Sequence, residues 1–133
     1  MIPKFRAWYV LAEEMINEIL MISFVRKEII GKFSDGSTSV PLKFEDKRNG
    51  EDVILMQSTG LEDKNGKEIF EGDIAKMAKD VYSDPTYYEI VRHRGGAYRL
   101  ESNQHGCELW LRHTNCEVIG NIYENPELLE EKQ

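Results

Sequence analysis

Residues 61–70 read Leu61-Glu62-Asp63-Lys64-Asn65-Gly66-Lys67-Glu68-Ile69-Phe70, and this stretch decides the fold of the chain. An Asn-Gly pair between short apolar runs is a strong signal for a β-hairpin, because both residues tolerate the positive φ angles of a type I′ turn. We therefore predict a tight hairpin with Asn65 and Gly66 at its turn. A second sharp turn is predicted directly afterwards, where Gly72 takes an unusual backbone angle and Asp73 caps the turn.

Short strands are predicted on both sides of these turns. Alternation of polar and apolar residues, or a short apolar run between turn residues, is typical of a strand. The predicted strands are residues 4–9, 40–44, 53–57, 74–78, 87–93, 97–101, 107–111 and 116–119. The Asn-Pro-Glu sequence at residues 125–127 is typical of the start of a short helix.

Residues 11–24 allow two interpretations. Apolar residues at positions 15, 16, 19, 20 and 22 approach the spacing of a helical stripe. The apolar run continues through Phe24 and Val25, however, which is typical of a strand. Propensity alone does not decide between the two.

The length of 133 residues suits one domain, and no Pro-, Gly- or Ser-rich stretch divides it. We therefore expect a single domain over residues 1–133. Many short strands with one terminal helix predict a mainly β fold, either a small antiparallel barrel or a curled sheet with extra hairpins and a short C-terminal helix.

The charge and composition restrict the class of protein. The net charge of −7 opposes general attraction to nucleic-acid phosphates. Charged residues interrupt every apolar run near the N-terminus, so we expect neither a signal sequence nor a membrane partner. Two cysteines in no framework pattern are typical of a reducing compartment, and we expect the protein in the cytoplasm of the cell that makes it.

Three blocks of sequence, in this order, carry a resemblance to a known family. They are Lys4-Phe5-Arg6-Ala7-Trp8, then Met56-Gln57-Ser58-Thr59-Gly60-Leu61-Glu62-Asp63-Lys64-Asn65-Gly66-Lys67-Glu68-Ile69-Phe70-Glu71-Gly72-Asp73-Ile74, and Asn115-Cys116-Glu117-Val118-Ile119-Gly120-Asn121-Ile122-Tyr123-Glu124-Asn125-Pro126-Glu127-Leu128. With these blocks the chain resembles the YopX family of phage and prophage proteins. No single block is a generic motif.

This resemblance implies a partly open barrel, homo-oligomeric assembly, phage or prophage origin and no assigned enzyme activity. It also favours strand over helix for residues 15–24. Within the three blocks we expect a structural role for the following residues: Trp8, Gly60, Asn65, Gly66, Gly72, Asp73, Gly120 and Asn121.

Two histidines and two cysteines lie close together in the sequence, at His105, Cys107, His113 and Cys116. Their spacing differs from the paired thiolates of a zinc site, so we expect no metal ion and Cys116 packed in the core beside Val118. A nucleophile formed by Cys107 and His113 would need a lowered thiol pKa and an orienting group, neither of which the sequence shows. We predict no catalytic residue, no cofactor and no enzyme activity.

The leading functional prediction is a non-enzymatic, phage-encoded accessory protein. It would act by homo-oligomerisation and by contact with a host or phage protein, since open strand edges need covering. Apolar groups expected near such a contact are Trp8, Tyr9, Trp110 and residues 19–22.

The alternative prediction is a small β-barrel that binds nucleic acid. Aromatic residues beside arginines are how small barrels hold single strands. The candidate residues are Arg92, Arg94, Arg99 and Arg112, which would need to share one concave face.

Overall fold

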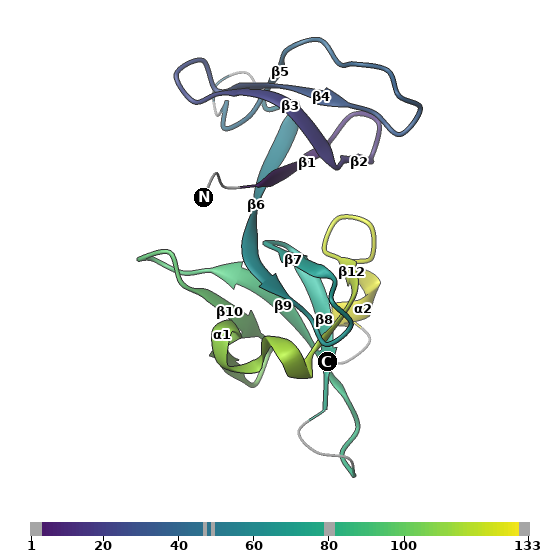
Figure 1. Cartoon of the computed structure of the whole chain (residues 1–133), viewed down its shortest axis with the longest axis vertical. Helices are drawn as coiled ribbons and strands as arrows, with labels where there is room; N and C mark the ends of the chain where they lie inside the picture. The colour runs from purple at the N-terminus through teal and green to yellow at the C-terminus, as the bar shows by residue number, and fades with distance from the viewer. Residues whose placement is uncertain (1–3, 47, 49, 79–81, 131–133) are drawn as a thin grey trace. The chain divides into compact units, whose positions relative to one another are not determined.

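The computed structural model describes residues 4–46, 48, 50–78 and 82–130. The fold is mainly β with curled sheets and a short helix near the C-terminus, as predicted (Figure 1). The chain forms two compact units, Met1–Gln57 and Ser58–Gln133. Strand β6 (Val53–Glu62) runs through the boundary between them. Among the described residues, no helix has the length and apolar character needed to cross a membrane.

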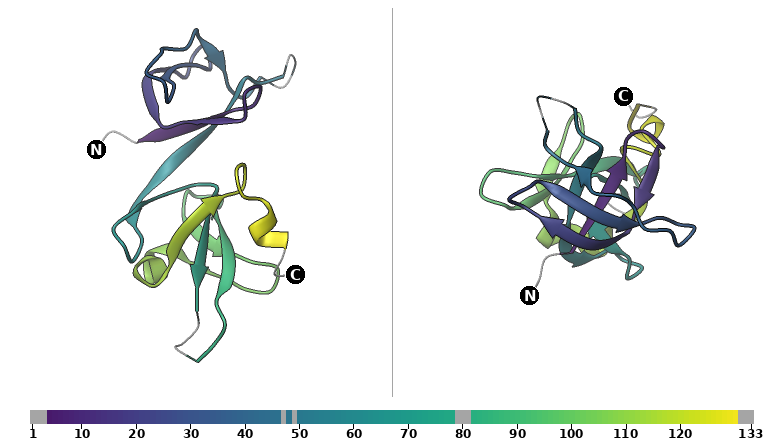
Figure 2. Two further views of the ribbon diagram at one scale, coloured as in Figure 1. Left: turned by 90° about the vertical axis from the view of Figure 1, so that its right-hand side faces the viewer. Right: turned by 90° about the horizontal axis from the view of Figure 1, so that it is seen from above.

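The first unit contains two small antiparallel groups of strands. Strand β1 (Phe5–Tyr9) pairs with β2 (Glu14–Ile16) on one side and with β6 on the other. Strands β3 (Glu18–Ser23), β4 (Glu28–Lys32) and β5 (Leu42–Lys43) form a sheet in that order. In Figure 2, left, the purple strand β1 lies opposite the blue strands of this sheet. Residues 15–24 therefore supply strands, as the family resemblance implied.

Side chains from both groups of strands form the core of the first unit. Its fully buried members are Ala7, Ile16, Ile29, Leu42, Phe44 and Val53. Gly31 in β4 makes room for this packing, because a Cβ atom built there would lie only 2.5 Å from Cγ2 of Ile16.

The second unit is a five-stranded antiparallel sheet with a short additional strand. Strand β7 (Glu68–Phe70) pairs with the second half of β6. The sheet order is β11-β10-β9-β8-β12. These strands are β8 (Asp73–Met77), β9 (Thr86–Arg92), β10 (Tyr98–Glu101), β11 (Gly106–Glu108) and β12 (Glu117–Asn121). The core residues are Ile69, Ala75, Met77, Tyr88, Ile90, Leu100, Leu109, Cys116 and Val118.

The strand predicted over residues 107–111 is wrong in its second half. The chain leaves β11 at Glu108 and forms a single α-helical turn, α1 (Leu109–Arg112), followed by the 3-10 turn η1 (His113–Asn115). Leu109 is fully buried, whereas Leu111 is 58% exposed. A strand would turn both leucines to the same face, whereas the helical turn places only Leu109 in the core. The predicted C-terminal helix is α2 (Glu127–Glu130).

The hairpin predicted over residues 61–70 is confirmed, but its turn type is wrong. Gly66 has the positive φ of +81°, while Asn65 is not among the described non-glycine residues with positive φ. The N–H of Gly66 donates to the carbonyl of Asp63 at 3.0 Å, and the N–H of Asp63 donates to the carbonyl of Lys67 at 2.8 Å. This is a three-residue loop with one left-handed glycine, not a two-residue type I′ turn.

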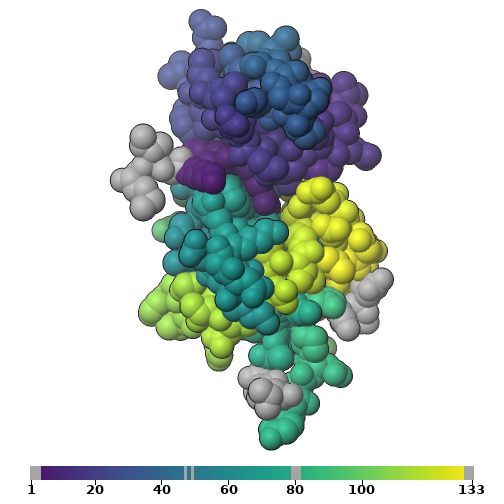
Figure 3. All heavy atoms as spheres, turned by 45° about the vertical axis from the view of Figure 1, so that its right-hand side comes forward, coloured from purple at the N-terminus to yellow at the C-terminus, as the bar shows by residue number. Residues whose placement is uncertain are grey.

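The side chain of Asp63 explains the difference. One carboxylate oxygen accepts the N–H groups of Asn65 and Lys67, both at 2.9 Å, and so holds the longer loop closed. The other accepts the N–H of Val118 in β12 at 2.8 Å. The hairpin (teal) and β12 (yellow-green) therefore lie side by side, as Figure 3 shows. Asp63 is 5% exposed.

Hydrogen bonding outweighs burial in setting the pKa of Asp63. Burial by itself would raise this pKa, but the N–H bonds from Val118, Lys67 and Asn65 and the charge of Lys67 together lower it below the usual 3.8. The ionised Asp63 carboxylate therefore stabilises the fold fully at pH values above its usual pKa. This stabilisation is lost as the pH falls through the lowered pKa of the folded protein.

We expect Asp63→Asn to destabilise the protein by about 1–3 kcal/mol at neutral pH, because an amide nitrogen cannot accept the N–H of Val118. Urea unfolding checks this. The unfolding midpoint of the unchanged protein should also fall between about pH 5 and about pH 3, and that fall should be smaller in the variant.

The matched control is Asp35→Asn. Asp35 also accepts turn hydrogen bonds, from the N–H and hydroxyl of Ser37, but it is exposed and bonds only within its own turn. Its replacement should have a smaller effect. Equal effects of the two substitutions would contradict the role given to Asp63.

We expect Gly31→Ala to destabilise the first unit by about 1–3 kcal/mol, because the added methyl group collides with buried Ile16. The double variant with Ile16→Leu, which removes the Cγ2 methyl branch that the added group would meet, should lose less stability than the sum of the two single changes. Additive losses in urea unfolding would show that the two residues do not compete for space.

Candidate functional site

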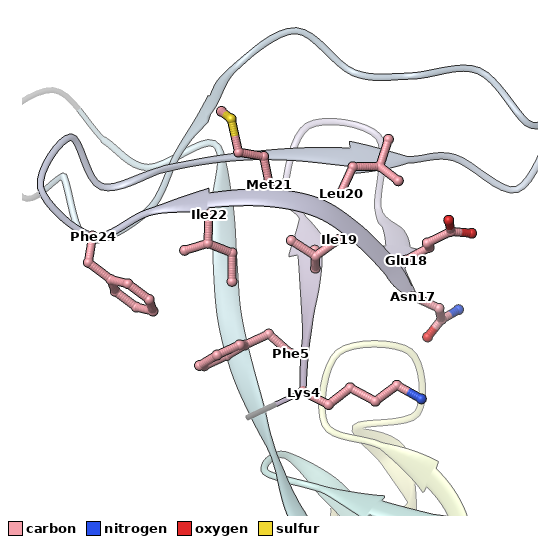
Figure 4. A pocket seen from close by; sticks show the side chains of 9 residues that line it. All are labelled: Lys4, Phe5, Asn17, Glu18, Ile19, Leu20, Met21, Ile22 and Phe24. Atoms are coloured by element: carbon pink, nitrogen blue, oxygen red, sulfur yellow. The ribbon is translucent and has the colours of Figure 1, made fainter. Parts of the chain in front are cut away.

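An apolar groove lies beside β3 in the first unit (Figure 4). Its volume is about 610 Å³, and β4 contributes no residue to its described lining. The lining residues are Lys4, Phe5, Asn17, Glu18, Ile19, Leu20, Met21, Ile22 and Phe24. Phe5 and Phe24 meet edge to face, with ring centroids 5.9 Å apart. The groove therefore lies between β3 and the start of β1.

A β-bulge at Leu20 shapes this strand. Ile19 pairs with Gly31 and Met21 with Ile30, so Leu20 has no partner residue in β4. In Figure 4, Ile19 and Ile22 point toward Phe5, whereas Leu20 and Met21 both point to the other side of the strand. Leu20 and Met21 are 50% and 48% exposed. The bulge thus places two apolar side chains together on the surface.

The other apolar residues predicted near a protein contact differ in exposure. Trp8 is buried, and Tyr9 is half-buried with its ring 5.7 Å from that of Phe33. The ring of Tyr9 thus packs against the core of the first unit. Trp110 is 64% exposed at α1, beside exposed Leu111. Of the predicted apolar contact residues, Leu20, Met21 and Trp110 are therefore exposed, whereas Ile19 and Ile22 are half-buried.

The second unit has a polar groove, also of about 610 Å³, beside β9, β10 and α2. Its carboxylates are Asp84, Glu89 and Glu101, and its described lining contains His105 but no lysine or arginine. Glu89 and Glu101 stand directly opposite each other on neighbouring strands. Burial raises the pKa of Glu89. Sequence reasoning missed this groove, because the facing of two glutamates depends on strand register.

Charged partners surround Glu101. Arg99 donates to Glu101 at 2.9 Å and to Glu108 at 2.6 Å, and a ring nitrogen of His93 lies 3.1 Å from Glu101. The hydrogen bond from Arg99 is the main reason why the pKa of Glu101 is lowered. Gly106 lies beneath these side chains, since a Cβ atom there would be 2.8 Å from an Arg99 nitrogen.

The four arginines predicted to bind nucleic acid are not on one face. Arg92 lies opposite Tyr98, while Arg99, the next residue along β10, lies opposite Val91. Side chains of directly opposed residues share a face, and neighbours along a strand alternate, so Arg92 and Arg99 point to opposite faces. Arg94 lies in the turn after β9, and Arg112 ends α1; both are exposed.

The cysteines and histidines do not form a metal site among the described residues, where no three His, Cys, Asp or Glu side chains come close enough to hold an ion. Cys116 is fully buried beside Val118 in the core, as predicted. Burial raises its pKa to about 11, and burial also raises the pKa of Cys107. A ring nitrogen of His113 lies 2.7 Å from the carbonyl oxygen of Glu62. A raised pKa leaves less of each thiol in the reactive thiolate form at neutral pH.

Several residues of the three sequence blocks hold turns. Gly66 and Gly72 lie in turns, and Gly60 lies within β6 where its pairing with β7 is irregular; all three have positive φ, which a side chain would strain. Asp73 is buried, and its carboxylate accepts the N–H of Phe70 at 2.8 Å, as expected for a turn cap.

Gly120 and Asn121 anchor the segment before α2. The amide oxygen of Asn121 accepts the N–H groups of Tyr123 at 3.0 Å and Glu124 at 2.8 Å. The Asn125 side chain accepts the N–H of Asn121 at 3.2 Å and lies where a Cβ atom on residue 120 would be. A side chain at position 120 would therefore collide with Asn125, so glycine is required there.

Comparison with known proteins gives relatives over most of the chain. The family model described as YopX protein matches residues 4–130. The crystal structure of protein EF1440 from Enterococcus faecalis is 34% identical, with a TM-score of 0.65, and the match covers 97% of this chain and 99% of that one. The crystal structure of yopX from Bacillus subtilis is 23% identical, with a TM-score of 0.64 and coverage of 94% and 96%. No curated protein is significantly similar.

The yopX structure supports the fold. The family model and the EF1440 structure support membership of a family. The blocks that carry the sequence resemblance include Asp63, Gly66, Gly72 and Asn121, which close the turns of the second unit. Because the family model spans residues 4–130 and a solved structure of 34% identity covers 97% of the chain, this protein belongs to the YopX protein family.

Proposed function

We propose that this protein is a non-enzymatic accessory protein that acts by self-association and by binding another protein. The observation that carries this proposal is β3, an edge strand with an apolar groove beside it and with Leu20, Met21 and Phe24 exposed. Unprotected apolar strand edges pair with other chains, and proteins that keep such an edge commonly cover it in an assembly.

The titratable groups support a role without catalysis. The pKa values of both thiols are raised, which makes thiolate scarce at neutral pH. The charges of Arg99 and Glu101 are engaged with each other and with neighbouring side chains. Groups in this state suit a structural role better than proton transfer or nucleophilic attack.

We propose a phage or prophage origin and a cytoplasmic location on separate grounds. The origin rests on the YopX family to which the chain belongs. The location is supported by Cys107 and Cys116, which are both free thiols, as a reducing compartment maintains them.

Nucleic-acid binding has less support. Arg99 is paired with two carboxylates, and it faces away from Arg92 across the sheet. A phosphate backbone is held by several cations that share one surface. A protein partner therefore fits the described surface better than a nucleic acid.

We expect the full-length chain to form a homo-oligomer at micromolar concentration. Size-exclusion chromatography with light scattering should give a mass that is a multiple of the chain mass of 15.4 kDa. The oligomer should resist high salt, because apolar contacts are screened less than charge contacts. A mass of one chain at every concentration would contradict self-association.

A further inference from the structure

We propose that β3 pairs with β3 of a second copy of this chain, antiparallel and about a two-fold axis. This inference rests on the self-association proposed above and names the surface that produces it. The strand beside the apolar groove then pairs with the identical strand of the second copy, and both copies use the same surface.

The outer edge of β3 is available for such pairing. Within the described residues, β3 pairs only with β4, and the backbone hydrogen bonds outside the strand ladders include none from residues 18–23. Backbone N–H and C=O groups on that edge lack protein partners and are ready to bond to another strand. The groove beside this strand is lined by residues 17–22 and 24, and by Lys4 and Phe5 across from them.

The faces of β3 match one particular register. When the two-fold axis passes between Leu20 and Met21, Ile19 lies opposite Ile22 of the second copy, and Leu20 lies opposite Met21 of the second copy. Ile19 and Ile22 share the side that points toward Phe5, and Leu20 and Met21 share the other side of the strand (Figure 4). Because opposed residues of paired strands lie on the same face, each side joins apolar groups to apolar groups.

The charges around β3 favour the antiparallel direction. Glu18 begins the strand, and Arg26 lies in the turn that follows it. No described residue forms an ion pair with either side chain. Antiparallel pairing brings Glu18 opposite Ser23 and toward the Arg26 turn of the second copy, at both ends of the contact. Parallel pairing in register would instead oppose the two Glu18 side chains, which is destabilising.

A charge exchange tests this register. Leu20→Lys alone and Met21→Glu alone each place like charges near the two-fold axis, and we expect each to raise the dissociation constant of the oligomer at least about tenfold. The double variant L20K/M21E places each lysine opposite a glutamate of the second copy, and we expect it to recover association. Sedimentation velocity over a concentration series measures all three.

The matched control is Leu111→Lys, which introduces the same charge at another exposed leucine, 58% exposed against 50% for Leu20. We expect it to leave association unchanged. Recovery in the double variant also shows that the single variants fold, since a misfolded chain would not be rescued by a second charge.

Three results would overturn the proposal. Association unchanged in L20K would show that the chain self-associates through another surface, with the proposed function intact. Loss of association in all three β3 variants alike would exclude the antiparallel register. A monomeric unchanged chain would contradict the self-association itself, and the pairing with it.

Discussion

The carboxylate of Asp63 accepts three backbone N–H groups, two from its own turn and one from Val118, which lies 55 residues further along the chain. A buried N–H group without an acceptor is costly, so the bond that Asp63 accepts from the buried N–H of Val118 matters most. The position of β12 beside the β6–β7 hairpin depends on this hydrogen bond between Val118 and Asp63. From that position β12 pairs with β8 and carries Asn121 to its own turn.

The first unit depends on a different constraint, which is the close packing of Ile16 against Gly31. A single residue, Asn17, separates β2 from β3 along the chain. The two strands nevertheless belong to different groups of strands in the first unit. This leaves β3 at an edge with its apolar residues half covered. A strand in this position satisfies its remaining backbone groups most readily by pairing outside the chain, which connects the fold to the proposed function.

Local chemistry predicted much of this fold, and tertiary context decided the rest. Gly66, Gly72 and Asp73 were predictable because their conformations follow from residue type. The turn type was not, since it depends on which backbone N–H groups of the loop the Asp63 carboxylate accepts. The bulge at Leu20 spaces Ile19 and Ile22 three residues apart on one side, which imitates a helix and explains the ambiguity of residues 11–24. The apolar character of residues 19–22 is evident from the sequence, whereas the separation of Arg92 from Arg99 required the strand register.

Because Cys116 is fully buried, its reactivity toward thiol reagents depends on local opening of the core. Its thiol has a raised pKa and lies within the core that β8, β9, β10 and β12 share. A covalent thiol reagent therefore reaches it only when that core opens, while half-buried Cys107 lies nearer to solvent. The rate of modification at Cys116, compared with that at an unfolded thiol, measures the free energy of local opening without any introduced label.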